Sequence, residues 1–167
     1  MLASLSSKTC GDSGRSSRGF ITKDFEELFA CLRRRNVKAL VVGGHAVAFH
    51  GRPRFTKDID VFVEASPENA TCLLAALADF GFAGLGLTVA DFIEPGKIIQ
   101  LGVAPNRVDL LTAIDGVSFE DAWRSRAPGH YGSEEVNYIG LSDLVRNKQA
   151  SARPQDLLDI DNLSKGE

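Results

Sequence analysis

Hydrophobic positions along the chain change between the spacing of helices and the continuous runs of buried strands. From Phe25 to Leu32, apolar side chains stand at the i, i+3, i+4 and i+7 positions, which predicts a helix with one apolar stripe. Thr22 precedes this stripe as a candidate N-cap, acidic residues fill the first turns and arginines close the segment, as the helix dipole favours. The apolar run at 38–44 ends in two glycines and predicts a short buried strand.

The rest of the chain divides into helices and strands by the same signals. The helix at 66–81 is marked by Ser66 as N-cap, Pro67 at the first helical position and Gly81 at its end. The other helices are expected at 45–51, 118–126 (capped by Ser118), 141–150 (capped by Ser142) and 153–163, and the other strands at 58–64, 97–103, 107–114 and 135–140. This order predicts an α/β (α+β) fold, in which helices flank a mixed, twisted sheet of about four or five strands in a single domain.

Composition changes this picture mainly at the N-terminus. Residues 1–19 are rich in serine and glycine without periodicity, which predicts a disordered tail before a domain at 20–167. A hydrophobic content of 44% and a net charge of −3 are ordinary for a globular protein and give no overall basic field for nucleic acid. No apolar run approaches the roughly 20 residues of a membrane span, and the three cysteines are widely spaced. We therefore expect a cytoplasmic protein with free thiols and no membrane contact.

Two aspartates flank one isoleucine at the start of the predicted strand 58–64. Successive side chains of a strand point to opposite faces, so Asp58 and Asp60 are expected on one face, about 6–7 Å apart, with Ile59 behind them. Carboxylates held in this way repel each other, and a hard divalent cation such as Mg²⁺ would remove the repulsion. The alternative is the charged solvent face of an edge strand, where carboxylates discourage aggregation.

A glycine turn precedes this pair, with thirteen residues between them. Gly43 and Gly44 end a strand and open a helix, an arrangement that offers backbone N–H groups to a phosphate. Such turns also form without a ligand, but Mg²⁺ commonly joins protein carboxylates to substrate phosphates, so the turn and the aspartates would form one site. Asp109 interrupts the apolar strand 107–114 and would be a third carboxylate; alternatively, it makes a local hydrogen bond at the strand end.

Together these residues resemble the nucleotidyltransferase superfamily that includes DNA polymerase β, over roughly residues 22–112. Its members carry a hydrophobic strand, Gly-Gly or Gly-Ser, a helix, an Asp-x-Asp strand and a third acidic strand. The resemblance implies a nucleotidyltransferase fold in which Gly43 and Gly44 line the triphosphate. It also implies that Asp58, Asp60 and Asp109 are the catalytic carboxylates and the metal ligands.

The segment from 43 to 60 is similar to the core of small bacterial members, including abortive-infection (type IV toxin) nucleotidyltransferases. Their pattern GGxAxxxHGxxRxTxDID is matched here by Gly51, Arg54 and Thr56 as well as by the glycines and aspartates. The resemblance implies that Arg54 and Thr56 contribute to the nucleotide site. Aminoglycoside nucleotidyltransferases share the Gly-Gly and Asp-x-Asp layout and are an alternative.

The C-terminal segment extends the likeness to the small bacterial members. Lys148, Arg153 and Asp156 match a later helix motif that approaches the nucleotide in this family, which makes Lys148 a further candidate contact. Gln155 departs from the motif, because the family often has lysine there.

The implied activity is the Mg²⁺-dependent transfer of a nucleoside monophosphate from a nucleoside triphosphate, such as ATP, to an acceptor hydroxyl, with one or two ions and release of pyrophosphate. The acceptor stays open among tRNA, a protein and a small molecule, and toxin-like members imply an antitoxin protein as partner. A non-catalytic module that binds nucleotide or a partner on the same fold is the second alternative. A complete set of three mutually repelling carboxylates favours the enzyme.

Overall fold

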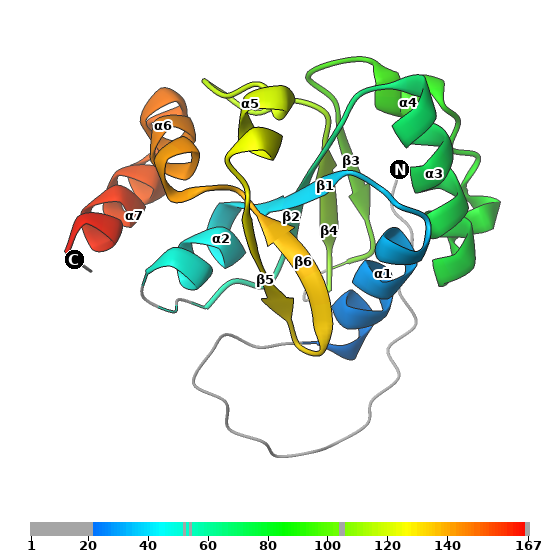
Figure 1. Ribbon diagram of the computed structural model, residues 1–167, viewed down its shortest axis with the longest axis horizontal. Coiled ribbons are helices and arrows are strands. Elements are labelled where there is room, and N and C mark those ends of the chain that lie inside the picture. Colours follow the sequence, from blue (N-terminus) through cyan, green and yellow to red (C-terminus); the bar gives the residue numbers. More distant parts are fainter. Residues whose placement is uncertain (1–21, 52, 54, 104–105, 166–167) are drawn as a thin grey trace.

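A mixed sheet of six strands forms the centre of the protein, with helices on both sides (Figure 1). The computed structural model describes residues 22–51, 53, 55–103 and 106–165, so the tail predicted at 1–19 lies outside the described residues. The strands stand in the order β3-β4-β2-β1-β6-β5. Their bounds are β1 (Ala39–Val42), β2 (Ile59–Val63), β3 (Ile98–Leu101), β4 (Val108–Leu111), β5 (Ala127–Tyr131) and β6 (Glu134–Tyr138).

The pairing of the strands confirms a mixed α/β sheet. β1 pairs antiparallel with β2, β3 with β4 and β5 with β6, whereas β2 runs parallel to β4 and β1 runs parallel to β6. The expected number of four or five strands was wrong, because β5 was missed. Its sequence contains Pro128 and Gly129, which are depleted in strand interiors, and an edge strand such as β5 is the position that tolerates them.

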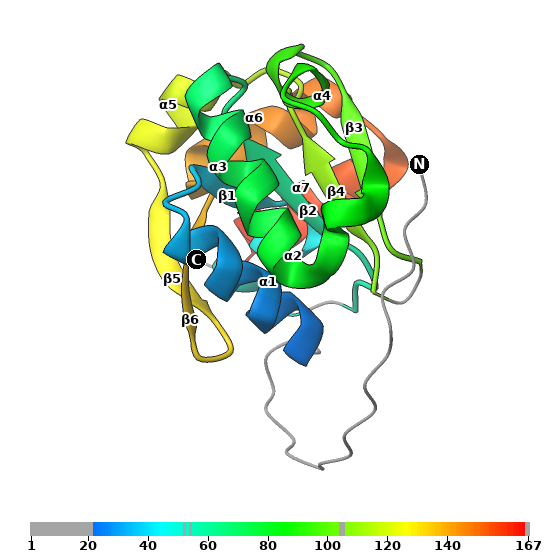
Figure 2. The ribbon, with the colours of Figure 1, turned by 90° about the vertical axis from the view of Figure 1, so that its right-hand side faces the viewer.

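Helices cover both faces of the sheet. The helices are α1 (Lys23–Arg34), α2 (Gly43–His50), α3 (Pro67–Leu77), α4 (Ala90–Ile93), α5 (Phe119–Arg124), α6 (Leu141–Ser151) and α7 (Pro154–Ser164), with a π turn η1 (Ala78–Phe82) and a 3₁₀ turn η2 (Ala83–Leu85) after α3. Figure 2 shows α1 and α3 side by side in front of the sheet, with α2 and α7 behind it. The sheet therefore separates an α1–α3 layer from a layer that contains α2, α6 and α7.

Most predicted helix caps are confirmed, and one is wrong. The hydroxyls of Thr22, Ser66 and Ser118 each accept a hydrogen bond from the backbone N–H three residues later, at 3.3, 3.2 and 3.2 Å. Ser142 does not cap α6, because that helix begins at Leu141 with Gly140 as its N-cap. The Gly140 carbonyl already accepts the N–H of Leu144 at 2.9 Å, which places Ser142 inside the first turn.

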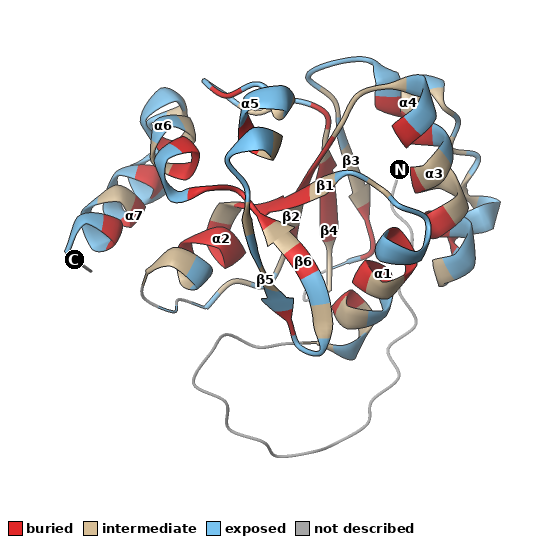
Figure 3. Ribbon diagram, in the orientation of Figure 1, coloured by how far each residue is buried: buried red, intermediate tan, exposed pale blue. Residues whose placement is uncertain are grey.

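The core lies mainly between the central strands and the α1–α3 layer. Figure 3 shows buried residues concentrated along β1, β2 and β4 and at the start of α2. Leu28, Val61, Leu73 and Leu110 are completely buried there, whereas the equally buried Leu40 is the register partner of Phe62 and lies on the other face of the sheet. Cys31 and Cys72 are free thiols. None of the helices in the described part of the chain combines the length and the apolar character that crossing a membrane requires.

Candidate active site

The parallel pairing of β2 and β4 brings two of the predicted carboxylates together. Asp60 is the register partner of Asp109, and neighbouring strands lie about 4.8 Å apart. Register partners point to the same face of a sheet, so Asp60 and Asp109 share one face. Asp58 lies two residues before Asp60, directly ahead of β2, and its side chain joins the same group through a shared contact with Arg107. The three aspartates therefore gather at the end of the sheet where β2 and β4 begin.

The glycine turn lies beside Asp60. Val42, the last residue of β1, is the register partner of Asp60, and α2 begins at the next residue. Gly43 has a φ of 64°, in the left-handed region that favours glycine, and a Cβ atom there would collide with Oδ2 of Asp60. Gly44 is buried in the first turn of α2. Glycine at position 43 thus allows the N-terminus of α2, where backbone N–H groups lack helical acceptors, to approach the carboxylates.

Arg107 ties two of the three carboxylates together. Its Nε donates to Oδ1 of Asp109 at 3.0 Å, and its Nη2 donates to Oδ2 of Asp109 at 3.2 Å. The same Nη2 lies 3.0 Å from Oδ2 of Asp58. Arg107 was not among the residues predicted for the site. The available signal was its spacing, because a residue two positions before Asp109 lies on the same face of the strand.

Asp60 is the aspartate of the cluster whose pKa is raised. Burial, followed by the negative charges of Asp109 and Asp58, raises the pKa of Asp60 from 3.8 to about 6. The positive charges of Arg107 and Arg153 act in the opposite direction without compensating for these effects. The site is therefore short of positive charge when all three aspartates are ionised.

Asp60→Asn is expected to stabilise the metal-free protein, and to do so more strongly as the pH rises. Folding raises the pKa of Asp60, so the folded state loses stability as Asp60 ionises, whereas asparagine has no charge to bury. A pKa shift from 3.8 to about 6 corresponds to a difference of about 3 kcal/mol in the free energy of unfolding between the variant and the wild type. This difference is absent at pH values below the unfolded pKa and complete at pH values above the folded pKa. Urea unfolding followed by circular dichroism from about pH 4 to pH 7, with a chelator present, measures the difference.

Asp79→Asn is the matched control for this experiment. Hydrogen bonds from Arg35 lower the pKa of Asp79, so its ionisation favours the folded state and the variant should lose a little stability at neutral pH. The two substitutions are thus expected to act with opposite signs. An Asp60→Asn protein that is no more stable than the wild type at neutral pH would contradict the electrostatic explanation.

The donor set suits a hard divalent cation, although it is not assembled as a metal centre. Among the residues that the structure describes, no three His, Cys, Asp or Glu side chains are placed so that they could hold a metal ion. Two of the aspartates instead bind Arg107. Oδ1 of Asp58, in contrast, is buried and has no hydrogen-bond partner within the described part of the chain, which makes it available as a ligand. The oxygen chemistry, the surplus negative charge and this oxygen fit Mg²⁺.

The other residues that match the family pattern before β2 are Gly51, Arg54 and Thr56, and those that the structure describes support the backbone. The Thr56 hydroxyl donates to the backbone carbonyl of Asp58 at 3.2 Å, which supports the turn into the strand. Gly51 ends α2, where its N–H donates to the Val47 carbonyl. Arg54, a candidate nucleotide contact, lies outside the described residues.

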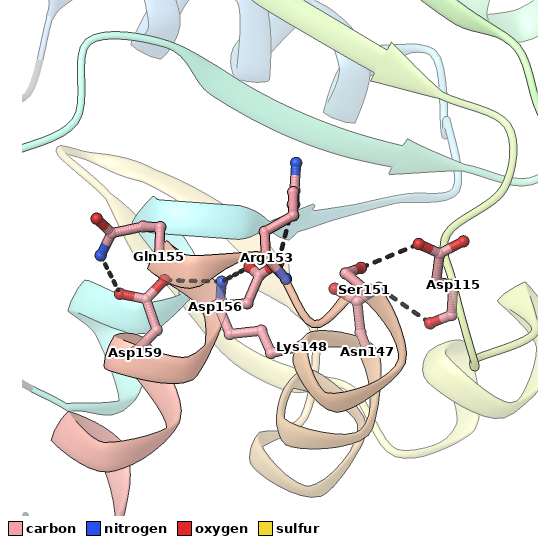
Figure 4. A network of polar contacts seen from close by, with 8 residues as sticks. All are labelled: Asp115, Asn147, Lys148, Ser151, Arg153, Gln155, Asp156 and Asp159. Atoms are coloured by element: carbon pink, nitrogen blue, oxygen red, sulfur yellow. Dashed lines mark hydrogen bonds and ion pairs between the residues drawn. The ribbon is translucent and has the colours of Figure 1, made fainter.

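Lys148 is buried between α6 and α7 rather than exposed towards a ligand (Figure 4). Its Nζ lies 3.0 Å from Oδ1 of Asp156 and 2.8 Å from Oδ2 of Asp159, and both carboxylates are buried. Gln155, at the position where the resemblance predicts lysine, donates to Oδ1 of Asp159 at 3.1 Å. A contact between Lys148 and a triphosphate would require the ammonium group to leave two buried ion pairs.

Arg153 links this buried network to the carboxylates. It is the N-cap of α7, and its Nε donates to Oδ2 of Asp156 at 2.8 Å. Burial raises the pKa of Asp156, but hydrogen bonds from Arg153 and Lys148 outweigh it, so the pKa lies below its ordinary value. The Arg153 side chain is 75% exposed, and its charge lowers the pKa of Asp60. The positive charge at the start of α7 therefore acts on Asp60 as well as on Asp156.

Comparisons with known proteins assign no function to this site, so its interpretation depends on its geometry. No protein-family model matches the chain, and no curated protein is similar enough to be counted as a relative.

Proposed function

We propose that the chain is a Mg²⁺-dependent nucleotidyltransferase that moves a nucleoside monophosphate from a nucleoside triphosphate to an acceptor hydroxyl and releases pyrophosphate. The observation that carries the proposal is the alignment of Asp60 with Asp109 on neighbouring strands, directly beside the Gly43 turn. Burial and the neighbouring carboxylates together raise the pKa of Asp60, so an ionised Asp60 is costly unless a cation compensates its charge. The N-terminus of α2 lies at the same place, and because helix N-termini favour phosphate, this position supports a nucleoside triphosphate as the substrate.

Each part of the site has a distinct task in this proposal. The backbone N–H groups at the start of α2, made accessible by Gly43 and Gly44, orient the triphosphate. Asp58 and Asp60 would hold Mg²⁺, which would neutralise the charge of the phosphates. Asp109 accepts the proton of the acceptor hydroxyl, whose oxygen then attacks the α-phosphorus. The bond between the α- and β-phosphates breaks, and pyrophosphate leaves with its electron pair.

The position of a radioactive label tests the proposed reaction directly. The protein is incubated with Mg²⁺ and each nucleoside triphosphate, labelled at either the α- or the γ-phosphate, together with total RNA and cell extract. We expect label to enter a macromolecule or small molecule from the α-labelled substrate, while the γ label appears as pyrophosphate. Asp58→Ala should abolish the transfer, and Asp121→Ala, at an exposed position on α5, should not.

Two results would contradict this function. Transfer of the γ label to an acceptor would identify a kinase instead. Absence of transfer with every triphosphate, together with Mg²⁺ and triphosphate-dependent stabilisation of the fold, would identify a nucleotide-binding module without turnover.

A further inference from the structure

One side chain occupies the space between two of the candidate catalytic carboxylates. Nη2 of Arg107 lies 3.0 Å from Oδ2 of Asp58 and 3.2 Å from Oδ2 of Asp109. Nε of Arg107 completes a two-point contact with Asp109 at 3.0 Å. A guanidinium that spans two carboxylates neutralises them in much the same way as a divalent cation would.

Arg107 is positioned for this contact by the sheet. It directly precedes β4, while Asp58 directly precedes β2, and the two strands run parallel in register. Both residues therefore lie at the same end of neighbouring strands. The side chains of Arg107 and Asp58 are 32% and 29% exposed, so the contact is open at the rim of the site and the guanidinium can leave without the sheet opening.

We propose that Arg107 is a resident counter-ion that competes with the divalent cation for Asp58. The proposal rests on the proposed function, because it takes Asp58 as a metal ligand. A cation that uses Oδ2 of Asp58 must displace the guanidinium, and part of its binding free energy is spent on breaking this ion pair. Oδ1 of Asp58, which is buried and has no partner among the described residues, is the ligand atom that needs no displacement.

A second arginine shows what a purely structural contact of this kind looks like. Arg35 binds both oxygens of Asp79 through Nε and Nη2, at 2.7 and 2.9 Å, where α1 ends beside η1. It therefore shares the two-point geometry of the Arg107–Asp109 contact. Arg35→Gln is the matched control for a substitution at Arg107.

The proposal is tested with Mn²⁺ alone, and without an activity assay. Binding of Mn²⁺ is measured by electron paramagnetic resonance and calorimetry for the wild type, Arg107→Gln and Arg35→Gln. We expect Arg107→Gln to bind Mn²⁺ about tenfold more tightly than the wild type, a gain of about 1.4 kcal/mol, because the competing charge is gone. Arg35→Gln should bind as the wild type does.

The other possible results of the Mn²⁺ titration distinguish failure of the proposed competition from failure of the proposed metal site. Equal Mn²⁺ affinity of the wild type and Arg107→Gln would overturn the competition and leave the proposed function standing. Absence of Mn²⁺ binding in both proteins would overturn the competition together with the proposed metal site. Weaker binding by Arg107→Gln would show that Arg107 organises the ligands instead of competing with the cation.

A measurement on the wild type keeps the test decisive if Arg107→Gln does not fold. The side-chain Nε–H signals of Arg107 and Arg35, assigned with the corresponding lysine variants, are followed by nuclear magnetic resonance while Mg²⁺ is added. The Arg107 signal should shift or broaden as the ion pair breaks, and the Arg35 signal should stay constant. An Arg107 signal that is unchanged at Mg²⁺ saturation would overturn the proposal.

Discussion

Replacing Asp109 with asparagine is expected to lower nucleotidyl transfer by about 100-fold or more, while triphosphate affinity changes only a few-fold. Asp58 and Asp60 belong to one strand and its immediate start, whereas Asp109 comes from the neighbouring strand. Under the proposed function, the first two hold the cation that accompanies the triphosphate, and Asp109 takes the acceptor proton. A positioned base acts in the transition state more than in nucleotide binding, so kcat should fall and KM should change little.

The measurement combines the α-label assay with calorimetric titration of the triphosphate in Mg²⁺. Asp161→Asn, at an exposed carboxylate on α7 that pairs with Lys165, is the control and should behave as the wild type. Circular dichroism is recorded first, because Asp109→Asn also removes a two-point partner of Arg107. Transfer near the wild-type rate would show that Asp109 is only a strand-end residue. Loss of triphosphate affinity in parallel with activity would assign Asp109 to holding the cation instead.

Replacing Lys148 with methionine is expected to cost about 3–5 kcal/mol of folding stability. The Lys148 side chain is 5% exposed, and the side chains of Asp156 and Asp159 are 4% and 0% exposed. Removal of the ammonium leaves two buried carboxylates close together without their shared cation. Asp156 keeps its contact with Arg153 and Asp159 keeps its hydrogen bond from Gln155, so the penalty is the loss of the shared cation from two buried carboxylates. Urea unfolding at neutral pH, followed by circular dichroism, measures the loss.

Two further variants separate charge from packing in this experiment. Lys165→Met removes an exposed ion pair on α7, with Asp161 at 2.6 Å, and should cost at most about 1 kcal/mol. Adding Asp159→Asn to Lys148→Met should restore part of the stability, because it removes one of the two buried carboxylates that share the Lys148 cation. A Lys148→Met protein that is as stable as Lys165→Met but no longer binds the triphosphate would instead support the nucleotide contact that the sequence resemblance implies.

Local patterns predicted most of the elements. The spacing from Phe25 to Leu32 predicted α1, and Ser66, Pro67 and Gly81 marked the limits of α3 and the turn that follows it. These predictions succeed because helix periodicity, caps and left-handed glycines depend on residues within a few positions of each other. β5 was missed for the opposite reason: an edge strand that contains proline and glycine is held by its pairing with β6, which no local pattern records.

The same division applies to the candidate site. The sequence by itself placed Asp58 and Asp60 together and put glycine where a chain enters a helix, because alternation along a strand and φ above zero are local properties. Only the tertiary structure decided that Asp109 stands beside Asp60, since strand order is set by packing between distant segments. The tertiary structure also decided which partners two positively charged side chains have. Arg107 spans Asp58 and Asp109, and Lys148 is buried between α6 and α7. The partner of a charged side chain depends on which segments the fold brings within a few ångströms, and the sequence lists charges without their distances.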